Sequence, residues 1–187
     1  MLQFIYLVLV GFVNAVLDAW EGIDPRTDIL TGIANRKHTL RKVKTAIKRA
    51  LRRGQFLCII LIDLDGLKQR NDSKGHSKGD WFIKAVTRYI NSNLQRFLNL
   101  PKKKVINFFG RIGGDELIII LPNTTMPQAQ AFMASMERRA GERKMSWGIS
   151  EQSPDGPQKS VEEMIDEADT EMYRHKQTKP RQRARAV

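Results

Sequence analysis

Acidic residues stand at the ends of two apolar runs in this sequence, and their spacing favours a site for a divalent cation. Asp63 and Asp65 close the run FLCIILIDLD, and the alternation of a strand places both side chains on one face. Asp115 and Glu116 follow two glycines and precede the apolar run Leu117 to Leu121. If the two runs pair in one sheet, the carboxylates converge, and a divalent cation would relieve their repulsion. The alternative for each acidic pair is a set of solvated loop acids.

The polar segment DGLKQRNDSKGHSKGD, residues 65–80, could read a nucleotide. Asn71, His76 and Asp80 offer an amide, an imidazole and a carboxylate. An amide and a carboxylate together can donate to and accept from the edge of guanine. Lys68 can reach a phosphate as a point charge. The alternative for His76 alone is an ordinary surface histidine. Metal plus a nucleoside triphosphate is therefore the occupant that this chemistry favours.

The elements that must position these residues alternate between helix and strand. Apolar periodicity predicts helices over 36–53, 81–98, 127–140 and 161–176, and strands over 56–65, 105–111, 117–121 and 144–150. We interpret 65–80 as loop with at most one helical turn. The order predicts an α/β sandwich in which helices cover a mixed central sheet.

The charge balance limits the partners. The formal net charge is +12, and it is concentrated in 36–53, 101–104 and 179–187. Such an excess attracts an anion, whether nucleic acid, nucleotide or lipid. A groove-reading motif with interleaved aromatic residues is missing, so we do not expect nucleic acid as a partner. The one cysteine, Cys58, lies in an apolar run and is expected to be a buried hydrophobe in a reducing compartment.

The N-terminus differs from the rest of the chain. Residues 1–17 carry no charged side chain. As a helix they would rise only about 25 Å, slightly less than the ~30 Å core of a bilayer. We leave two interpretations open: a membrane anchor through residues 1–20, or a helix that packs on the domain or on a partner chain. We therefore divide the chain into an apolar helix and linker (1–23), one domain (24–178) and a basic tail (179–187).

Five stretches of the sequence, taken in order, resemble the signature blocks of the GGDEF domain, the diguanylate cyclase family. The resemblance covers about residues 24 to 180. The blocks are DILTGIANR (28–36), DLDGLKQRNDSKGHSKGD (63–80), RIGGDEL (111–117), MSWGIS (145–150) and ADTEMYRHK (168–176).

The resemblance implies a fold, a reaction and a partner. The fold would be ferredoxin-like, of the nucleotidyl-cyclase type. The reaction would join two GTP molecules into cyclic di-GMP and release two pyrophosphates. It would depend on Mg²⁺, two ions per GTP, with Mn²⁺ as a substitute. Because each domain holds one GTP, the active enzyme would be a homodimer. The expected location is the bacterial cytoplasm, with or without attachment to the inner membrane.

The resemblance also implies roles for individual residues. The expected metal ligands are Asp63, the carbonyl of Leu64, Asp115 and Glu116. Asp115 would also help to deprotonate the attacking 3′-hydroxyl. The remaining roles concern the nucleotide: Asn71, His76 and Asp80 for guanine, and Gly66, Leu67, Lys68 and Lys176 for the phosphates, with Lys68 counted among the catalytic groups.

Two departures from the family pattern bear on function. Many members carry Arg-x-x-Asp before the hairpin, a site where product binds and inhibits, and this chain has Lys104 and Asn107 there. After Lys176 the family often has Gly-Arg three and four residues on, and this chain has Lys179 and Pro180. The alternative to an active cyclase is a catalytically silent domain that binds GTP or cyclic di-GMP as a receptor.

Overall fold

A four-stranded sheet forms the centre of the protein. The computed structural model describes residues 24–100, 104, 107–141 and 143–179. The N-terminal apolar segment and nearly all of the basic tail lie outside the described residues, so the predictions made for them stay predictions. The strands are β1 (Leu57–Leu64), β2 (Phe109–Arg111), β3 (Glu116–Pro122) and β4 (Met145–Gln152), in the order β2-β3-β1-β4.

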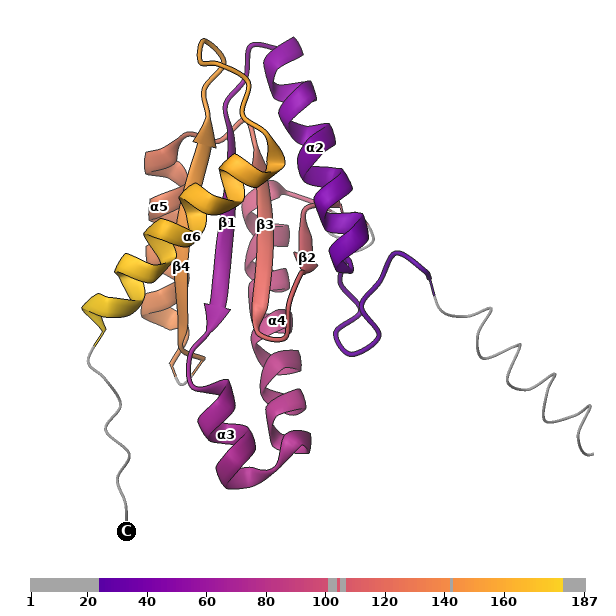
Figure 1. Ribbon diagram of the computed structural model, residues 1–187, viewed down its shortest axis with the longest axis vertical. Helices are drawn as coiled ribbons and strands as arrows, with labels where there is room; N and C mark the ends of the chain where they lie inside the picture. The colour runs from indigo at the N-terminus through magenta and orange to yellow at the C-terminus, as the bar shows by residue number, and fades with distance from the viewer. Residues whose placement is uncertain (1–23, 101–103, 105–106, 142, 180–187) are drawn as a thin grey trace, which may run out of the picture.

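Every pair of neighbouring strands in this sheet is antiparallel, so the predicted mixed strand direction is wrong in this detail. β3 and β4 do run in the same direction, since helix α5 returns the chain between them. However, β1 lies between these two strands and runs opposite to both (Figure 1). The described residues show parallel pairing only at an isolated bridge from Ala34 to Gly110.

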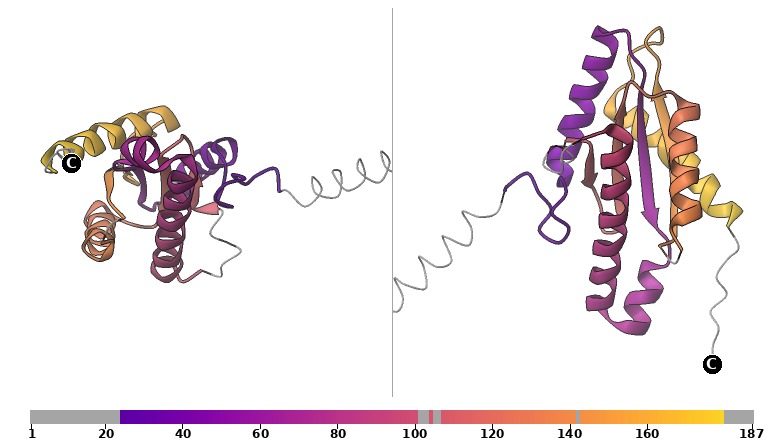
Figure 2. Two further views of the ribbon diagram at one scale, coloured as in Figure 1. Left: turned by 90° about the horizontal axis from the view of Figure 1, so that it is seen from below. Right: turned by 180° about the vertical axis from the view of Figure 1, so that it is seen from behind.

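Helices cover both faces of the sheet, as the predicted sandwich requires. Helices α2 (Arg36–Arg52) and α6 (Val161–Thr178) lie on one face. Helices α4 (His76–Leu98) and α5 (Met126–Arg139) lie on the other (Figures 1 and 2).

The two faces explain why β1 is apolar almost throughout. Ile60 and Ile62 belong to the core under α4 and α5, and Ile59 and Leu61 belong to the core under α2 and α6. All four are at most 2% exposed. Burying one such side chain stabilises the fold by about 1.5–3 kcal/mol. Because β1 is buried on both faces, its C-terminal end, which carries Asp63, is held in a fixed position.

The segment predicted as loop over 65–80 is mostly helical, and that prediction is wrong. Helix α3 covers Leu67–Lys74, and α4 begins at His76 rather than near residue 81. Gly66 (φ 76°) and Gly75 (φ 79°) flank α3, and their positive φ values lie in the region that glycine tolerates best. The sequence hides α3 because Leu67 is its one buried residue, so apolar periodicity is missing.

The other helices lie close to their predicted ranges. The side chain of Asn35 caps α2 by accepting from the backbone N–H of His38 at 3.0 Å, as expected for this residue type. Helix α6 begins with a capping box between Ser160 and Glu163. Of the helices in the described part of the chain, none has the length and apolar character needed to cross a bilayer.

Candidate active site

The tip of the β2–β3 hairpin meets the end of β1. Asp63 and Glu116 are register partners in the β1–β3 ladder. The backbone N–H of Leu64 donates to the carbonyl oxygen of Asp115 at 3.1 Å. Asp63 follows Ile59 and Leu61 on the face that α6 covers. The sheet therefore brings together acidic residues that lie far apart in the sequence, as the pairing argument predicted.

Arg111 holds the turn that carries the acids. Its guanidinium donates to the carbonyl oxygens of Gly114 at 2.7 Å and Gly113 at 3.1 Å. It also pairs with Asp28 at 3.2 Å. Burial alone would raise the pKa of Asp28, but hydrogen bonds from Thr31 and the charge of Arg111 hold it below its ordinary value. Sequence reasoning did not identify this pair, although both residues lie in the family-like blocks.

The glycines of the turn provide space rather than an unusual backbone conformation. Neither Gly113 nor Gly114 has a positive φ. A Cβ atom on Gly113 would lie 2.3 Å from Oε2 of Glu116. The carboxylate of Glu116 therefore folds against the turn, and any larger residue at 113 would displace it.

The acids of this site perturb one another. Burial raises the pKa of Asp63, the hydrogen bond from Lys176 opposes this, and the charges of Asp115 and Asp65 add to the rise. Burial also raises the pKa of Glu116, and Asp115 and Asp63 raise it further. Carboxylates that are both partly buried and repelled by their neighbours gain from a nearby cation.

Lys176 supplies one such cation. Its Nζ lies 2.8 Å from Oδ1 of Asp63. Burial would lower the pKa of Lys176, but the hydrogen bond and charge of Asp63 outweigh this and raise it. The Lys176 side chain is 48% exposed, so it can leave Asp63 without a large rearrangement.

The donor set fits magnesium better than a metal that needs an all-protein cage. In the described part of the chain, no three Asp, Glu, His or Cys side chains are arranged to hold a metal ion by themselves. Mg²⁺ usually takes only one or two protein carboxylates and completes its shell with substrate phosphates and water. Asp63 and Asp115 are suited to that smaller role because the backbone brings them close together: Leu64 donates to the carbonyl oxygen of Asp115, and Asp63 faces Glu116 in the strand register.

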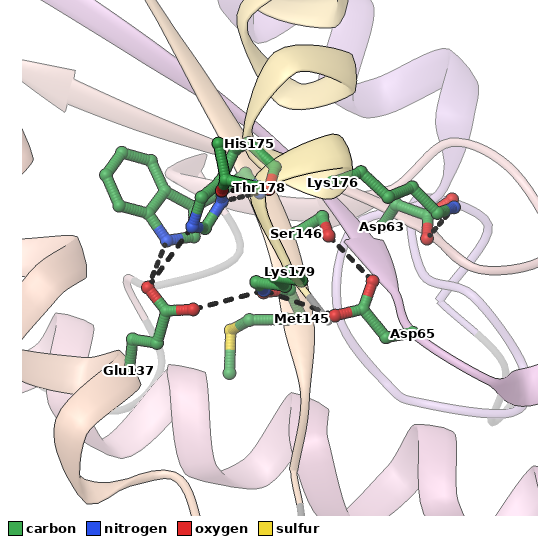
Figure 3. Close-up of polar contacts among 10 residues, drawn as sticks. Asp63, Asp65, Glu137, Met145, Ser146, His175, Lys176, Thr178 and Lys179 are labelled. Carbon is green, nitrogen blue, oxygen red and sulfur yellow. Dashed lines mark hydrogen bonds and ion pairs between the residues drawn. The ribbon is translucent and has the colours of Figure 1, made fainter. Parts of the chain in front are cut away.

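Asp65 lies near this acidic cluster but has hydrogen-bond partners of its own. Its Oδ1 accepts a hydrogen bond from the hydroxyl of Ser146 at 2.7 Å. Its Oδ2 pairs with Lys179 at 3.2 Å, and Lys179 also pairs with Glu137 at 3.1 Å (Figure 3). Alternation along the strand predicted that Asp63 and Asp65 share a face. Both side chains pair with lysines at the C-terminal end of α6, Asp63 with Lys176 and Asp65 with Lys179, although β1 itself ends at Leu64.

Glu137 extends this network to the other side of β4. It accepts from the indole Nε1 of Trp147 at 3.1 Å and lies 3.5 Å from Nε2 of His175. The Trp147 and His175 rings lie 4.6 Å apart, and the backbone N–H of Trp147 donates to Nδ1 of His175. Sequence reasoning missed this network, because its members come from three separate elements and share no local spacing.

The proposed guanine-reading residues lie on the α3–α4 hairpin. The Oδ1 atom of Asn71 is buried and has no hydrogen-bond partner among the described residues. It packs so tightly on α4 that a Cβ on Gly79 would lie 1.7 Å from it. Asp80 follows Gly79 directly and is exposed, and His76 is exposed at the first position of α4. The structure thus places Asn71 against Gly79, the residue that directly precedes Asp80.

The proposed phosphate-binding residues lie where β1 passes into α3. Gly66 precedes α3, Leu67 is its first residue, and Lys68 is exposed. A cavity of about 480 Å³ opens beside this turn, with Asp65, Gly66, Lys176 and Lys179 among its lining residues. The turn, Asp65 and the two lysines therefore border one accessible region.

Comparison with known proteins places this geometry in context. The family model described as "Diguanylate cyclase, GGDEF domain" matches residues 26–182. Response regulator PleD of Caulobacter vibrioides is 34% identical over 103 residues, which are 55% of this chain and 21% of that protein. Diguanylate cyclase DgcS of Shewanella oneidensis is 32% identical over 62% of this chain and 36% of that protein. The chain thus spans between a fifth and about a third of these relatives.

Solved structures give the same fold. The GGDEF domain of DgcB from Caulobacter crescentus, crystallised with c-di-GMP, aligns with a TM-score of 0.71 at 25% identity and covers 83% of this chain and 90% of that one. The GGEEF domain of a Vibrio cholerae diguanylate cyclase aligns with a TM-score of 0.65 at 26% identity and covers 77% of this chain and 91% of that one.

Proposed function

Because the chain belongs to the GGDEF domain family of diguanylate cyclases, we propose that it condenses two GTP molecules into cyclic di-GMP and releases two pyrophosphates. The observation that carries the proposal is the junction of the β2–β3 turn with the end of β1. There Asp115 and Glu116 lie against Asp63, within reach of the flexible cation Lys176.

Asp63, Asp115 and Glu116, with the carbonyl of Leu64, are the groups that would hold Mg²⁺, two ions per GTP, or Mn²⁺ as a substitute. The bound metal would neutralise phosphate charge and lower the pKa of the attacking hydroxyl. Asp115 would also help to deprotonate the attacking 3′-hydroxyl. The raised pKa of Glu116 makes it a carboxylate that gains from an added positive charge.

The phosphates would be bound by the β1–α3 turn. Gly66 and Leu67 offer backbone N–H groups close to the start of α3, where the helix dipole favours an anion. Lys68 and Lys176 add positive charge on either side of the turn. Lys176 can move from Asp63 to a phosphate once Asp63 is otherwise neutralised.

The guanine base would bind between α3 and α4. Asn71 has a buried acceptor with no partner in the part of the chain that the structure describes, and an unmet buried acceptor favours a ligand that donates to it. Asp80 can accept from N1–H and the amino group of guanine together, which favours guanine over adenine. His76 lies at the same end of α4 and would contribute to the rim of this site.

Each chain provides half of the active centre, so we propose a homodimer. In the condensation, the 3′-hydroxyl of one GTP attacks the α-phosphate of the other, and two domains must face each other with two-fold symmetry. We assign the domain to residues 24–178, the preceding segment 1–23 to anchoring or dimerisation, and 179–187 to a basic tail. We expect the protein in the bacterial cytoplasm, with residues 1–20 as the segment that would contact the inner membrane.

The competing function is a silent receptor for GTP or cyclic di-GMP. Incubation of the purified full chain with GTP and Mg²⁺, followed by chromatography, separates the two functions. The proposal predicts cyclic di-GMP and pyrophosphate from the wild type and neither product from Asp115→Asn. Tight GTP binding without any cyclic dinucleotide would instead favour the receptor.

Product inhibition is a separate property, and we propose that it is weak. Lys104 cannot fork onto guanine or phosphate as arginine does. The amide nitrogen of Asn107 donates to the carbonyl oxygen of Lys104 at 3.3 Å, so this side chain stabilises the local turn. Initial rates should therefore change little when cyclic di-GMP is added at low micromolar concentration. Strong noncompetitive inhibition that disappears in Lys104→Ala would contradict this.

A further inference from the structure

Two lysines at the end of α6 hold two acids at the end of β1. Lys176 pairs with Asp63 at 2.8 Å, and Lys179, almost one helical turn later, pairs with Asp65 at 3.2 Å (Figure 3). The two lysines nevertheless differ in their surroundings. The Lys176 side chain is 48% exposed and the Lys179 side chain 24% exposed. Lys176 has one acidic partner among the described residues, whereas Lys179 has two.

The second partner of Lys179 lies on another helix. Glu137, on α5, pairs with it at 3.1 Å. The Lys179 ammonium also donates to the carbonyl oxygen of Met145, at the start of β4. Lys179 therefore joins the β1–α3 turn to α5 and β4. Its three contacts match the three donors of an ammonium group.

The acid that Lys179 holds lies next to the proposed phosphate-binding turn. Asp65 directly precedes Gly66, whose left-handed backbone starts α3. The hydroxyl of Ser146 donates to the other oxygen of Asp65, so both carboxylate oxygens are bound. With Asp65 fixed in this way, the backbone N–H groups of Gly66 and Leu67 have a defined direction.

We propose that Lys179 is a positioning residue: by bridging Asp65 and Glu137 it fixes the β1–α3 turn for Mg-GTP and leaves Lys176 as the lysine that contacts the phosphates. This inference rests on the proposed function, because the turn matters only if it binds nucleotide. It also accounts for the position at which this chain has lysine where the family often has glycine. A direct contact between Lys179 and phosphate is the competing role, and it would require Lys179 to leave two carboxylates.

A double-mutant cycle on the full chain separates the two roles. The variants are Lys179→Met, Glu137→Gln and the double variant. Lys159→Met serves as the matched control, because Lys159 pairs with Glu167 away from the site. The measurements are kcat and KM for GTP, the Mg²⁺ concentration at half-maximal rate, and the binding of a non-reactive GTP analogue with Mg²⁺.

The positioning role predicts coupled effects. Lys179→Met should lower kcat/KM by about 10-fold to 100-fold, since a small misplacement of binding groups can cost that much. It should also raise the Mg²⁺ requirement, and Lys179→Arg should recover most of the loss. Glu137→Gln should show a smaller loss in the same direction, and the double variant should be no worse than Lys179→Met alone, as expected for residues that act as a unit. Lys159→Met should behave as wild type.

Other outcomes overturn the inference. If Glu137→Gln is silent or increases activity while Lys179→Met is impaired, Lys179 acts on phosphate directly. If Lys179→Met matches Lys159→Met in rate and in analogue binding, the bridge has no role. A wild type that binds the analogue but forms no product contradicts the proposed cyclase, whereas the analogue-binding cycle still reports on Lys179.

Discussion

The interior of β1 and its C-terminal end are adjacent in the sequence, yet they differ in polarity and in their effect on stability. Residues 57–62 are at most 2% exposed and entirely apolar. Asp63 and its register partner Glu116 are partly buried acids whose pKa values are raised by burial and by the charges of neighbouring acids, among them Asp115. The interior gains stability from burial, whereas the end gives up stability to keep charges close together. The sheet is therefore a rigid support for a cluster of carboxylates that is unfavourable by itself.

The largest contrast should come from one substitution in each region. Asp115→Asn should lower the rate of cyclic di-GMP formation on the order of 10³-fold, because it removes a charge that the metal and the 3′-hydroxyl require. Its thermal midpoint should stay equal or rise, since like-charge repulsion is relieved. Product formation and thermal unfolding measured on the same preparation test this. Full activity in Asp115→Asn would remove this residue from the mechanism.

The matching change in the interior is Ile60→Ala. This side chain is fully buried under α4 and α5, so its truncation should lower the free energy of unfolding by about 2–5 kcal/mol. The rate per folded molecule at low temperature should remain near that of wild type. Denaturant unfolding and initial rates provide the two readouts. A large loss of rate with unchanged stability would reverse the assignment of the two regions.

A smaller effect is expected at the base-reading helix pair. Asp80→Asn should raise KM for GTP about 10-fold to 100-fold, corresponding to the ~1.5–3 kcal/mol of a charge-assisted hydrogen bond. The matched control is Asp72→Asn, an exposed acid on α3 next to Asn71. Steady-state kinetics with GTP and with ATP test the point. Equal effects of the two substitutions would argue against guanine recognition by Asp80.

The smallest effect concerns stability and pH. Glu116 has a raised pKa in the folded state, so its contribution to stability is fully present below its ordinary pKa of 4.5 and is lost as pH rises through the folded value. Glu116→Gln should therefore raise the thermal midpoint at pH 7 on the order of 1 °C, and the gain should vanish near pH 4. Thermal unfolding without metal measures this. A loss of stability at pH 7 would show that the Glu116 carboxylate is favourably paired.

Much of the fold was predictable from local pattern. The core helices and the long strands carry strong apolar periodicity, and the pairing of β1 with the hairpin follows from two dry runs that each end in acids. Helix α3 was not predictable in this way, since it forms by packing Leu67 and Asn71 against α4 and has only one buried side chain of its own. The antiparallel direction of every neighbouring pair was not predictable either. It depends on the position of β1 between β3 and β4, and no local pattern in the sequence indicates this strand order.

The site divides in the same manner. Asp63, Asp115 and Glu116 could be selected from their places at strand ends, and the structure puts them together. The Lys179 bridge could not, because Asp65, Glu137 and Lys179 meet only after the turn, α5 and α6 have folded onto one another. The one signal in the sequence was a lysine at a position where the family often has glycine.

The most direct test of the account is whether Asp63 and Asp115 bind one cation together. Mn²⁺ binding, followed by paramagnetic resonance with a non-reactive GTP analogue present, measures this for the wild type, Asp63→Asn and Asp115→Asn. The account predicts analogue-dependent Mn²⁺ binding in the wild type and a severe loss in either variant alone. Wild-type binding in Asp63→Asn or in Asp115→Asn would contradict a shared site.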